Sequence, residues 1–229
     1  MPTSATLREA TATMTGSDTS AEFDRQVQTL VDLGYPALAG LTEDAFRDLF
    51  GPLRAPVTAR AAGVRLPPAE GRAPFLLVVT RALVPLEQSV PLTTLAGKKS
   101  PGVIERFYAP GELERFVSLP ELALPDGAVY VVFDVDRGEE FCGAVPSDAL
   151  STVAARGRTP LTIEEGVAFV AQYPQALAKN KCFSLGGSRL GDRRVPALWI
   201  SKGAPKLGWC WEGNPHTWLG LASAGGRAG

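Results

Sequence analysis

The residues best suited to chemistry lie in one stretch near the end of the chain, residues 182–218. It holds all four tryptophans, the only histidine and two of the three cysteines. It also holds more basic than acidic side chains: Arg189, Arg193, Arg194, Lys202 and Lys206 against Asp192 and Glu212. Indole rings among cations and glycines can form a recognition surface or a core with a polar edge. The sequence therefore locates a candidate site without identifying a reaction.

Anion binding is the first hypothesis for this stretch. The glycines between Cys182 and Arg193 would let backbone amides approach an anion, which arginine side chains could then clamp. The residues that we predict to bind such a ligand are four cations and three stacking rings: Arg189, Arg193, Lys202, Lys206, Trp209, Trp211 and Trp218. The glycines lack the Walker lysine–serine ending and the strand–GxGxxG–helix context of a nucleotide motif. The alternative is a glycine-rich turn with solvated arginines.

Packing offers a different explanation for the tryptophans. Trp209 and Trp211 alternate along a predicted strand and would share one face, with Trp199 on the partner strand. Cross-strand aromatic contacts would then account for the rings without a ligand. Against this, Lys206 and Trp218 lie close in sequence to that surface. We therefore expect an open cationic and aromatic surface, on which reversing the charge of Lys206 would barely change stability.

Nucleophilic catalysis by a thiol is the second hypothesis. Cys182 or Cys210 would attack an acyl or similarly electrophilic group, with His216 as the base and Asp192 orienting it. Free cysteines are also commonly buried as small hydrophobic side chains, and His216 could simply hydrogen-bond a loop. The same thiols with His216 and Cys142 could bind zinc, but their spacing lacks the paired knuckles of structural zinc sites. We therefore expect no metal and no cofactor.

The composition is that of an ordinary globular protein. The chain has 229 residues, 45% hydrophobic and 21% charged, with a net charge of −1. That charge gives no general attraction to nucleic acid or membranes; single-stranded nucleic-acid binding is kept as a third hypothesis because the residue types fit it. Three widely spaced cysteines favour a reducing compartment, and we find no signal peptide and no run of ~20 apolar residues. We predict a cytoplasmic protein without a membrane partner, binding a small anionic ligand or a protein partner.

Apolar periodicity and turn residues predict two helices, then strands, then helices, then strands. Helices should begin after Thr19, Thr42, Ser147 and Thr162, where capping residues precede apolar stripes. Strands should cover residues 75–80, 129–135, 197–201 and 207–211, the last two forming a hairpin. Residues 51–74, rich in proline, are interpreted as a connection. This segregation predicts an α+β fold with a mainly antiparallel sheet flanked by helices.

The sequence also predicts a single domain. No break in composition marks a linker between residues 21 and 222, so we expect these residues to fold together. Residues 1–20 are rich in Thr, Ser and Ala and show no apolar period, which predicts a disordered tail. Residues 223–229 are expected to form a flexible C-terminal tail.

Three passages carry a resemblance to a known family. The most distinctive is PALWISKGAPKLGWCWEGNPHTWLG, residues 196–220, and residues 25–36 and 161–167 agree with it. On these passages the chain resembles a family of uncharacterised bacterial proteins described as a domain of unknown function, over most of residues 20–224. The resemblance implies a single-domain bacterial protein and brings no catalytic residue with it.

Overall fold

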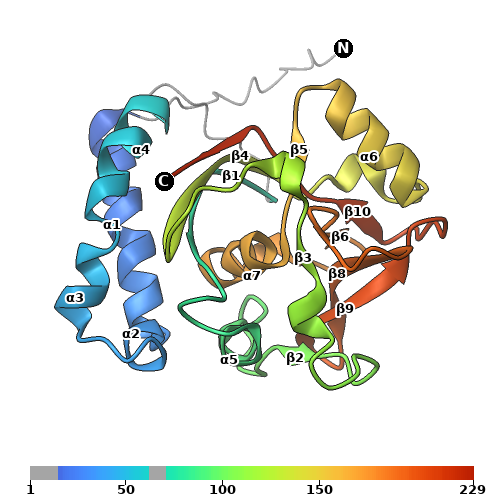
Figure 1. Ribbon diagram of the computed structural model, residues 1–229, viewed down its shortest axis with the longest axis horizontal. Helices are drawn as coiled ribbons and strands as arrows, with labels where there is room; N and C mark the ends of the chain where they lie inside the picture. The colour runs from blue at the N-terminus through green and yellow to red at the C-terminus, as the bar shows by residue number, and fades with distance from the viewer. Residues whose placement is uncertain (1–14, 62–70) are drawn as a thin grey trace, which may run out of the picture.

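The structure is a computed structural model that describes residues 15–61 and 71–229. A layer of helices covers one face of a first sheet, helix α7 covers its other face, and a second sheet packs against α7 from the far side (Figure 1). The core between the two sheets includes Leu76, Val132, Phe169 and Leu198, all buried. The predicted α+β class, with mainly antiparallel sheets in a single domain, is confirmed.

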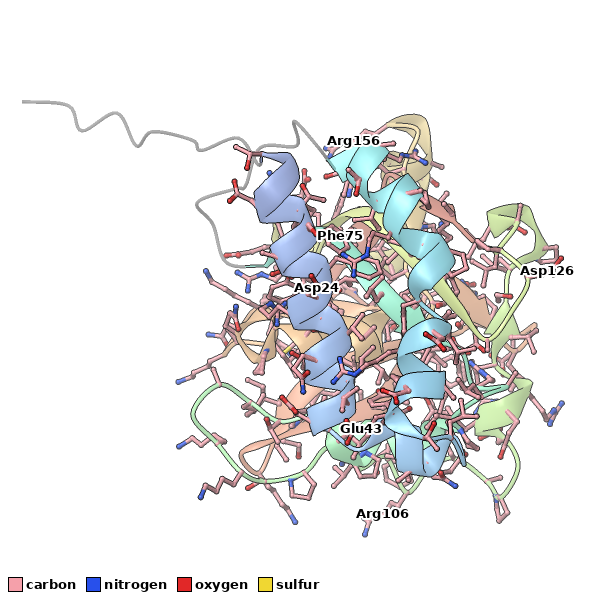
Figure 2. All side chains as sticks on the ribbon, turned by 90° about the vertical axis from the view of Figure 1, so that its left-hand side faces the viewer. Asp24, Glu43, Phe75, Arg106, Asp126 and Arg156 are labelled. Carbon is pink, nitrogen blue, oxygen red and sulfur yellow. The ribbon has the colours of Figure 1, made fainter. Side chains whose placement is uncertain are left out.

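The helical layer packs its apolar side chains on the first sheet. Its elements are α1 (Gly16–Asp32), α2 (Tyr35–Leu38), α3 (Glu43–Asp48), the 3-10 turn η1 (Gly51–Leu53) and α4 (Arg54–Ala61). Phe23, Leu30 and Phe46 are buried against Phe75 and Phe133 of the sheet. Figure 2 shows this layer from its outer side, with Asp24 on α1 and Glu43 on α3.

The start of α1 differs from the prediction. Thr15, not Thr19, caps the helix, because Asp18 donates its N–H to Thr15 Oγ1 and accepts the Thr15 N–H in return. Thr19 lies inside the helix, where its hydroxyl donates to the Thr15 carbonyl. The predicted disordered tail is therefore wrong for residues 15–20, and residues 1–14 lie outside the described residues.

The connection predicted for residues 51–74 is also wrong in part, since η1 and α4 lie within it. Pro52 and Pro56 fall in the first turns of these two elements, where an absent N–H breaks no intrahelical hydrogen bond. The proline content of this segment therefore does not exclude helical structure. Residues 62–70 of this segment lie outside the described residues.

The first sheet is built on β1 (Arg72–Val79) and β4 (Val129–Asp136), which pair antiparallel with Phe75 opposite Phe133. Short strands complete it: β5 (Thr159–Pro160), β11 (Ser223–Ala224) and β12 (Gly226–Ala228). Helix α7 (Ile163–Gln172) starts with the capping box predicted at Thr162.

The last residues of the chain are not a flexible tail. Residues 223–224 form β11 and residues 226–228 form β12 of the first sheet, so that prediction is wrong. Arg227 donates from Nε and Nη2 to both carboxylate oxygens of Glu165, at 2.5 and 2.8 Å. The Arg227 side chain is 5% exposed and that of Glu165 is fully buried. A buried two-point ion pair of this kind fixes the chain end on the first turn of α7.

The second sheet has the order β10 (Leu219–Leu221), β6 (Cys182–Ser184), β8 (Arg194–Ser201), β9 (Ala204–Trp211) and β2 (Val103–Ile104). The predicted hairpin is confirmed as β8 and β9, joined by Lys202 and Gly203 alone. Both turn residues have positive φ, 51° and 77°, which a two-residue type I′ turn requires. The edge strand β2 runs parallel to β9, with Val103 opposite Lys206.

The remaining elements are short. They are α5 (Leu86–Ser89), η2 (Val90–Leu92), η3 (Leu113–Arg115), η4 (Pro120–Leu122), η5 (Glu139–Phe141), α6 (Pro146–Ala155), η6 (Pro174–Ala176), and the pair β3 (Val117–Ser118) and β7 (Ser188–Arg189). The cap of α6 is Val145, two residues before the predicted Ser147. Across residues 15–61 and 71–229, no helix combines the length and apolarity needed to cross a bilayer.

Candidate functional site

The β8–β9 hairpin carries most of the predicted ligand-binding residues, and its register divides them. Arg194 faces Trp211 at one end of the hairpin, and Trp199 faces Lys206 near the turn. Because side chains alternate between faces along a strand, Trp209 and Trp211 share one face and Trp199 lies on the other. The predicted packing of Trp199 with the other two rings is therefore wrong. The predicted site separates into two regions.

The first region, which we call the open end, comprises residues 189–194 and 209–212 with Glu112 and Phe116. Its centre is Arg194, whose guanidinium lies over the rings of Trp209 and Phe116, at 5.1 and 5.4 Å from their centroids. The same guanidinium donates to Glu112 and to Asp192, each at 2.8 Å, and its side chain is 13% exposed. Arg194 thus joins neighbouring side chains of the protein, and Glu112 and Asp192 compensate its charge.

Carboxylates also hold the other two arginines of the open end. Arg189 pairs with Glu212 at 2.5 Å and Arg193 with the same carboxylate at 3.4 Å. The two cations predicted to clamp an anion therefore meet on a carboxylate of the protein itself. Trp211 is 47% exposed and touches Trp209 edge-on, with ring centroids 5.2 Å apart.

The acidic partners at the open end are held in their charged form. The hydrogen bond from Arg194 lowers the pKa of Glu112 below its ordinary value. Burial acts to raise the pKa of Asp192, but the N–H and guanidinium of Arg194 both donate to it and the net shift is downward. At neutral pH the charges of this region are therefore balanced within the protein.

The second region is a groove of about 660 Å³ beside the hairpin turn, which we call the turn groove. Its lining comes from residues 100–107, which include β2, and from the turn end of the hairpin. The lining residues are Ser100, Pro101, Val103, Ile104, Glu105, Arg106, Phe107, Ser201, Lys202, Ala204 and Lys206. Of the predicted ligand-binding residues, Lys202 and Lys206 are brought together here.

The turn groove has more positive than negative charge. Lys206 pairs with Glu105 at 2.5 Å and lies 6.0 Å from the centroid of Trp199. Burial acts to raise the pKa of Glu105, but hydrogen bonds from Lys206 and the Arg106 N–H give a net lowering. Lys202 is exposed, and within the described part of the chain its side chain has no ion-pair or hydrogen-bond partner. Lys206 is thus paired, whereas no carboxylate of the described residues forms an ion pair with Lys202 or Arg106.

Apolar side chains are also exposed at the turn groove. Five large hydrophobic side chains are exposed among the described residues: Leu38, Val103, Phe107, Val117 and Trp211. Two of them line this groove, Phe107 at 66% and Val103 at 42%. Arg106 lies over the Phe107 ring at 5.3 Å. Sequence reasoning missed Arg106 and Phe107, because only the pairing of β2 with β9 brings them to the hairpin.

Trp218, predicted to stack on a ligand, is not among the residues that line the turn groove. Its half-buried ring packs edge-on against Trp199, with centroids 6.4 Å apart, and tilted against His216 at 5.1 Å. A row of contacting side chains therefore starts at Lys206 in the turn groove and continues through Trp199 and Trp218 to His216.

The predicted thiol–histidine pair is not assembled. Cys182 is 4% exposed, and no hydrogen bond among the described residues joins the His216 ring to a thiol or to Asp192. Burial raises the pKa of Cys142, Cys182 and Cys210, that of Cys210 to about 11. Thiols of this kind are mostly protonated at neutral pH, whereas the thiolate is the nucleophile.

The described residues also contain no metal-binding cluster. In the parts of the chain that the structure describes, no group of three or more His, Cys, Asp or Glu side chains is placed to hold a metal ion. The three cysteines are all free thiols.

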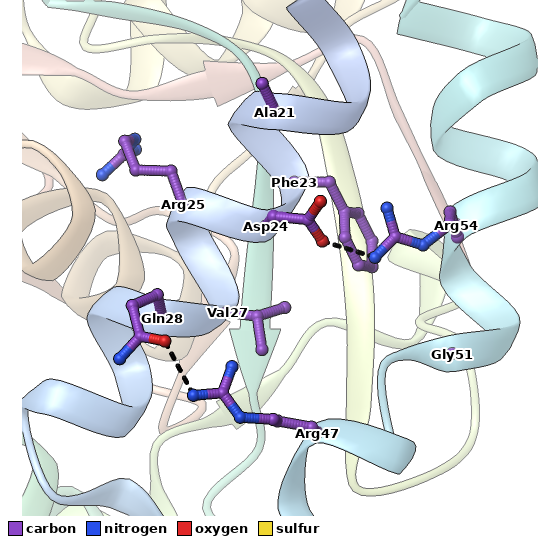
Figure 3. A pocket seen from close by; sticks show the side chains of 9 residues that line it. All are labelled: Ala21, Phe23, Asp24, Arg25, Val27, Gln28, Arg47, Gly51 and Arg54. Carbon is purple, nitrogen blue, oxygen red and sulfur yellow. Dashed lines mark hydrogen bonds and ion pairs between the residues drawn. The ribbon is translucent and has the colours of Figure 1, made fainter. Parts of the chain in front are cut away.

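Another groove, of about 530 Å³, lies in the helical layer between α1 and the α3–α4 segment (Figure 3). Arg54 pairs across it with Asp24 at 2.5 Å. Arg47 donates across it to Gln28 Oε1 at 2.7 Å. A third guanidinium, that of Arg25, is held by a carboxylate three residues earlier on α1. Each cation here already has a partner, so this helical groove offers less free charge than the turn groove.

Comparison with known proteins gives one match. The model of a family of unknown function, DUF5701, matches residues 29–229. That range includes both sheets, the hairpin and the turn groove. Neither the curated proteins nor the solved structures contain a match to the chain. The comparisons therefore assign no role to any residue.

Proposed function

We propose that this chain, which belongs to the DUF5701 family of unknown function, binds an anionic ligand with an apolar part in its turn groove. The observation that carries the proposal is the free charge of Lys202 at the hairpin turn, beside an exposed aromatic ring. An anionic head would meet Lys202, Lys206 and Arg106, and an apolar body would cover Phe107 and Val103.

The open end is a poorer place than the turn groove for an anionic ligand, because its cations are already paired. A ligand anion there would have to displace Glu212 from Arg189 and Arg193, or Glu112 from Arg194. In the turn groove the Lys206–Glu105 pair is the only ion pair among residues 15–61 and 71–229 that competes with the ligand. Of the seven residues predicted to bind ligand, the proposal therefore keeps Lys202 and Lys206. It assigns no ligand contact to Arg189, Arg193, Trp209, Trp211 and Trp218, whose partners are other residues of the protein.

The turn groove is consistent with either a small anion or an anionic segment of a protein partner, as the sequence suggested. The cytoplasm is the proposed compartment, supported by three cysteines that are all free. The bacterial origin implied by the resemblance is likewise part of the proposal. No observation favours the thiol enzyme, so we do not advance it.

A pair of fluorescent probes tests the proposal. We expect 1-anilinonaphthalene-8-sulfonate, an aromatic anion, to bind the folded protein more tightly than the uncharged N-phenyl-1-naphthylamine. Lys202→Glu should weaken binding of the anion roughly tenfold, because two units of charge change at contact distance. Binding of the uncharged probe should change less than about twofold, since it has no charge to lose.

Arg193→Glu is the matched control, because Arg193 is an exposed cation directly before β8, at the open end. We expect it to leave the affinity for both probes within about twofold. An equal loss of affinity for the anionic probe in the two variants would contradict the proposal, and so would an unchanged affinity in Lys202→Glu.

A further inference from the structure

We infer that the turn groove docks on the surface of an anionic phospholipid bilayer. This inference rests on the proposed function, names the source of the anion and departs from the sequence-based expectation of no membrane partner. It starts from a local excess of charge that the net charge of −1 conceals. Residues 95–107 and 201–206 contain five cations and one carboxylate: Lys98, Lys99, Arg106, Lys202 and Lys206 against Glu105.

The five cations form a set that extends beyond the groove. Lys98 and Lys99 are exposed and precede Ser100, the first residue that lines the groove. Neither lysine has a side-chain partner within the described parts of the chain, and only Lys206 of the five is paired with a carboxylate. Arg106 projects at the edge of the molecule, on the far side from the start of α1 (Figure 2). Charge spread over two loops suits an extended anionic surface better than one small anion.

Exposed apolar side chains among these cations distinguish a bilayer from other polyanions. Phe107 and Val103 are 66% and 42% exposed, beside Arg106 and Lys202 in the same groove. An aromatic ring flanked by cations suits the boundary between lipid headgroups and acyl chains, where the ring is buried and the charges meet phosphates. An acidic peptide would satisfy the charges without requiring this exposed ring. Docking of this kind needs no membrane-spanning helix.

Vesicle binding by the full chain tests the inference. We expect binding to vesicles of phosphatidylglycerol and phosphatidylcholine mixed about 3:7, and none to vesicles of phosphatidylcholine alone, with affinity falling as salt rises. Lys98→Ala/Lys99→Ala should weaken vesicle binding roughly 25-fold, about fivefold for each lysine near the surface. Phe107→Ser should weaken it roughly tenfold by removing the inserted ring.

The control removes two charges elsewhere. Lys179 lies on the turn before β6 and Arg193 at the open end, so Lys179→Ala/Arg193→Ala should keep vesicle affinity within about twofold. All variants should keep the melting temperature of the parent chain, because every substituted side chain is exposed.

The same variants separate failure of this inference from failure of the proposed function. Because Lys98 and Lys99 do not line the groove, their removal should leave binding of the anilinonaphthalene sulfonate probe within about twofold. Probe binding without vesicle binding would overturn the lipid inference alone. Binding to soluble poly-glutamate but not to vesicles would overturn it in favour of an acidic protein segment. An equal loss of vesicle affinity in the control variant would also overturn it.

Discussion

The two ends of the β8–β9 hairpin use the same residue types to opposite effect. At the open end, Arg194 contacts two aromatic rings and two carboxylates, and ion pairs within the protein neutralise its charge. At the turn, Lys202 has no partner in the described chain and Phe107 is exposed. Cations beside aromatic rings therefore stabilise the fold at the open end, whereas at the turn they are exposed and can contact a ligand. The number of carboxylates makes the difference: three of them pair with the three arginines of the open end, whereas among the described residues Glu105 alone pairs with a cation of the turn groove.

The largest expected effect concerns the two tryptophans of the open end. Trp209→Ala should lower the free energy of unfolding by about 3 kcal/mol, because its half-buried ring contacts both Arg194 and Trp211. Trp211→Ala should cost about 1 kcal/mol, since that ring is 47% exposed. Urea denaturation of both variants checks the difference. A larger loss in Trp211→Ala would mean that the outer ring is the buried one.

Arg194→Ala should lower the free energy of unfolding by about 2 kcal/mol, because it leaves Glu112 and Asp192 without their partner. The effect should depend on pH. The folded pKa of both carboxylates is lowered, so the stability they contribute is present above their ordinary pKa and is lost as pH falls through the lowered one.

The parent chain should therefore lose stability below about pH 4.3, and the Arg194→Ala variant should lose less over the same range. Urea midpoints measured between neutral pH and pH 3 check this. Parallel pH profiles for the two proteins would show that Arg194 does not hold the two carboxylates in their charged form.

Lys206→Glu should lower the free energy of unfolding by about 1 kcal/mol, more than the nearly unchanged stability expected from the sequence. Lys206 is 21% exposed and pairs with Glu105, which is 12% exposed, so the substitution places two carboxylates together. Thermal unfolding at pH 7 measures the loss. An unchanged melting temperature would show that the pair is not formed in solution.

Lys202→Glu and Arg193→Glu should have the smallest effect on stability, within about 0.5 kcal/mol for each. Both residues are exposed, and Arg193 makes only a 3.4 Å contact with Glu212. Calorimetric melting of the two variants tests this. A loss above about 2 kcal/mol in Lys202→Glu would show that the turn needs this lysine for folding, and the contrast between the ends would disappear.

Local signals predicted the elements that depend on local interactions. The capping box at Thr162, the strand at residues 129–135 and the hairpin around Lys202 all follow from neighbouring residues, and the structure contains each of them. Helix α4 was missed because Pro56 in its first turn, with Pro52 in η1 just before it, resembles the prolines of a loop. The C-terminal strands were missed because Arg227 is fixed by Glu165, 62 residues earlier.

The candidate site shows the same limit. The sequence located the hairpin and its cations, but it could not show which cations are paired. Glu105 and Glu112, which neutralise Lys206 and Arg194, come from segments far earlier in the chain. Arg106 and Phe107 reach the site only through the parallel pairing of β2 with β9. Ion pairs and strand pairs between distant segments have no local sequence signal.

Nuclear magnetic resonance gives the most direct test of the claim that the turn, and not the open end, is the binding end. The measurement follows the backbone amide signals of the nitrogen-15-labelled chain while 1-anilinonaphthalene-8-sulfonate is added. We predict saturable shifts confined to residues 100–107 and 201–206, the two segments of the turn groove. Shifts centred on residues 189–194 and 209–212, with the turn unaffected, would contradict the claim.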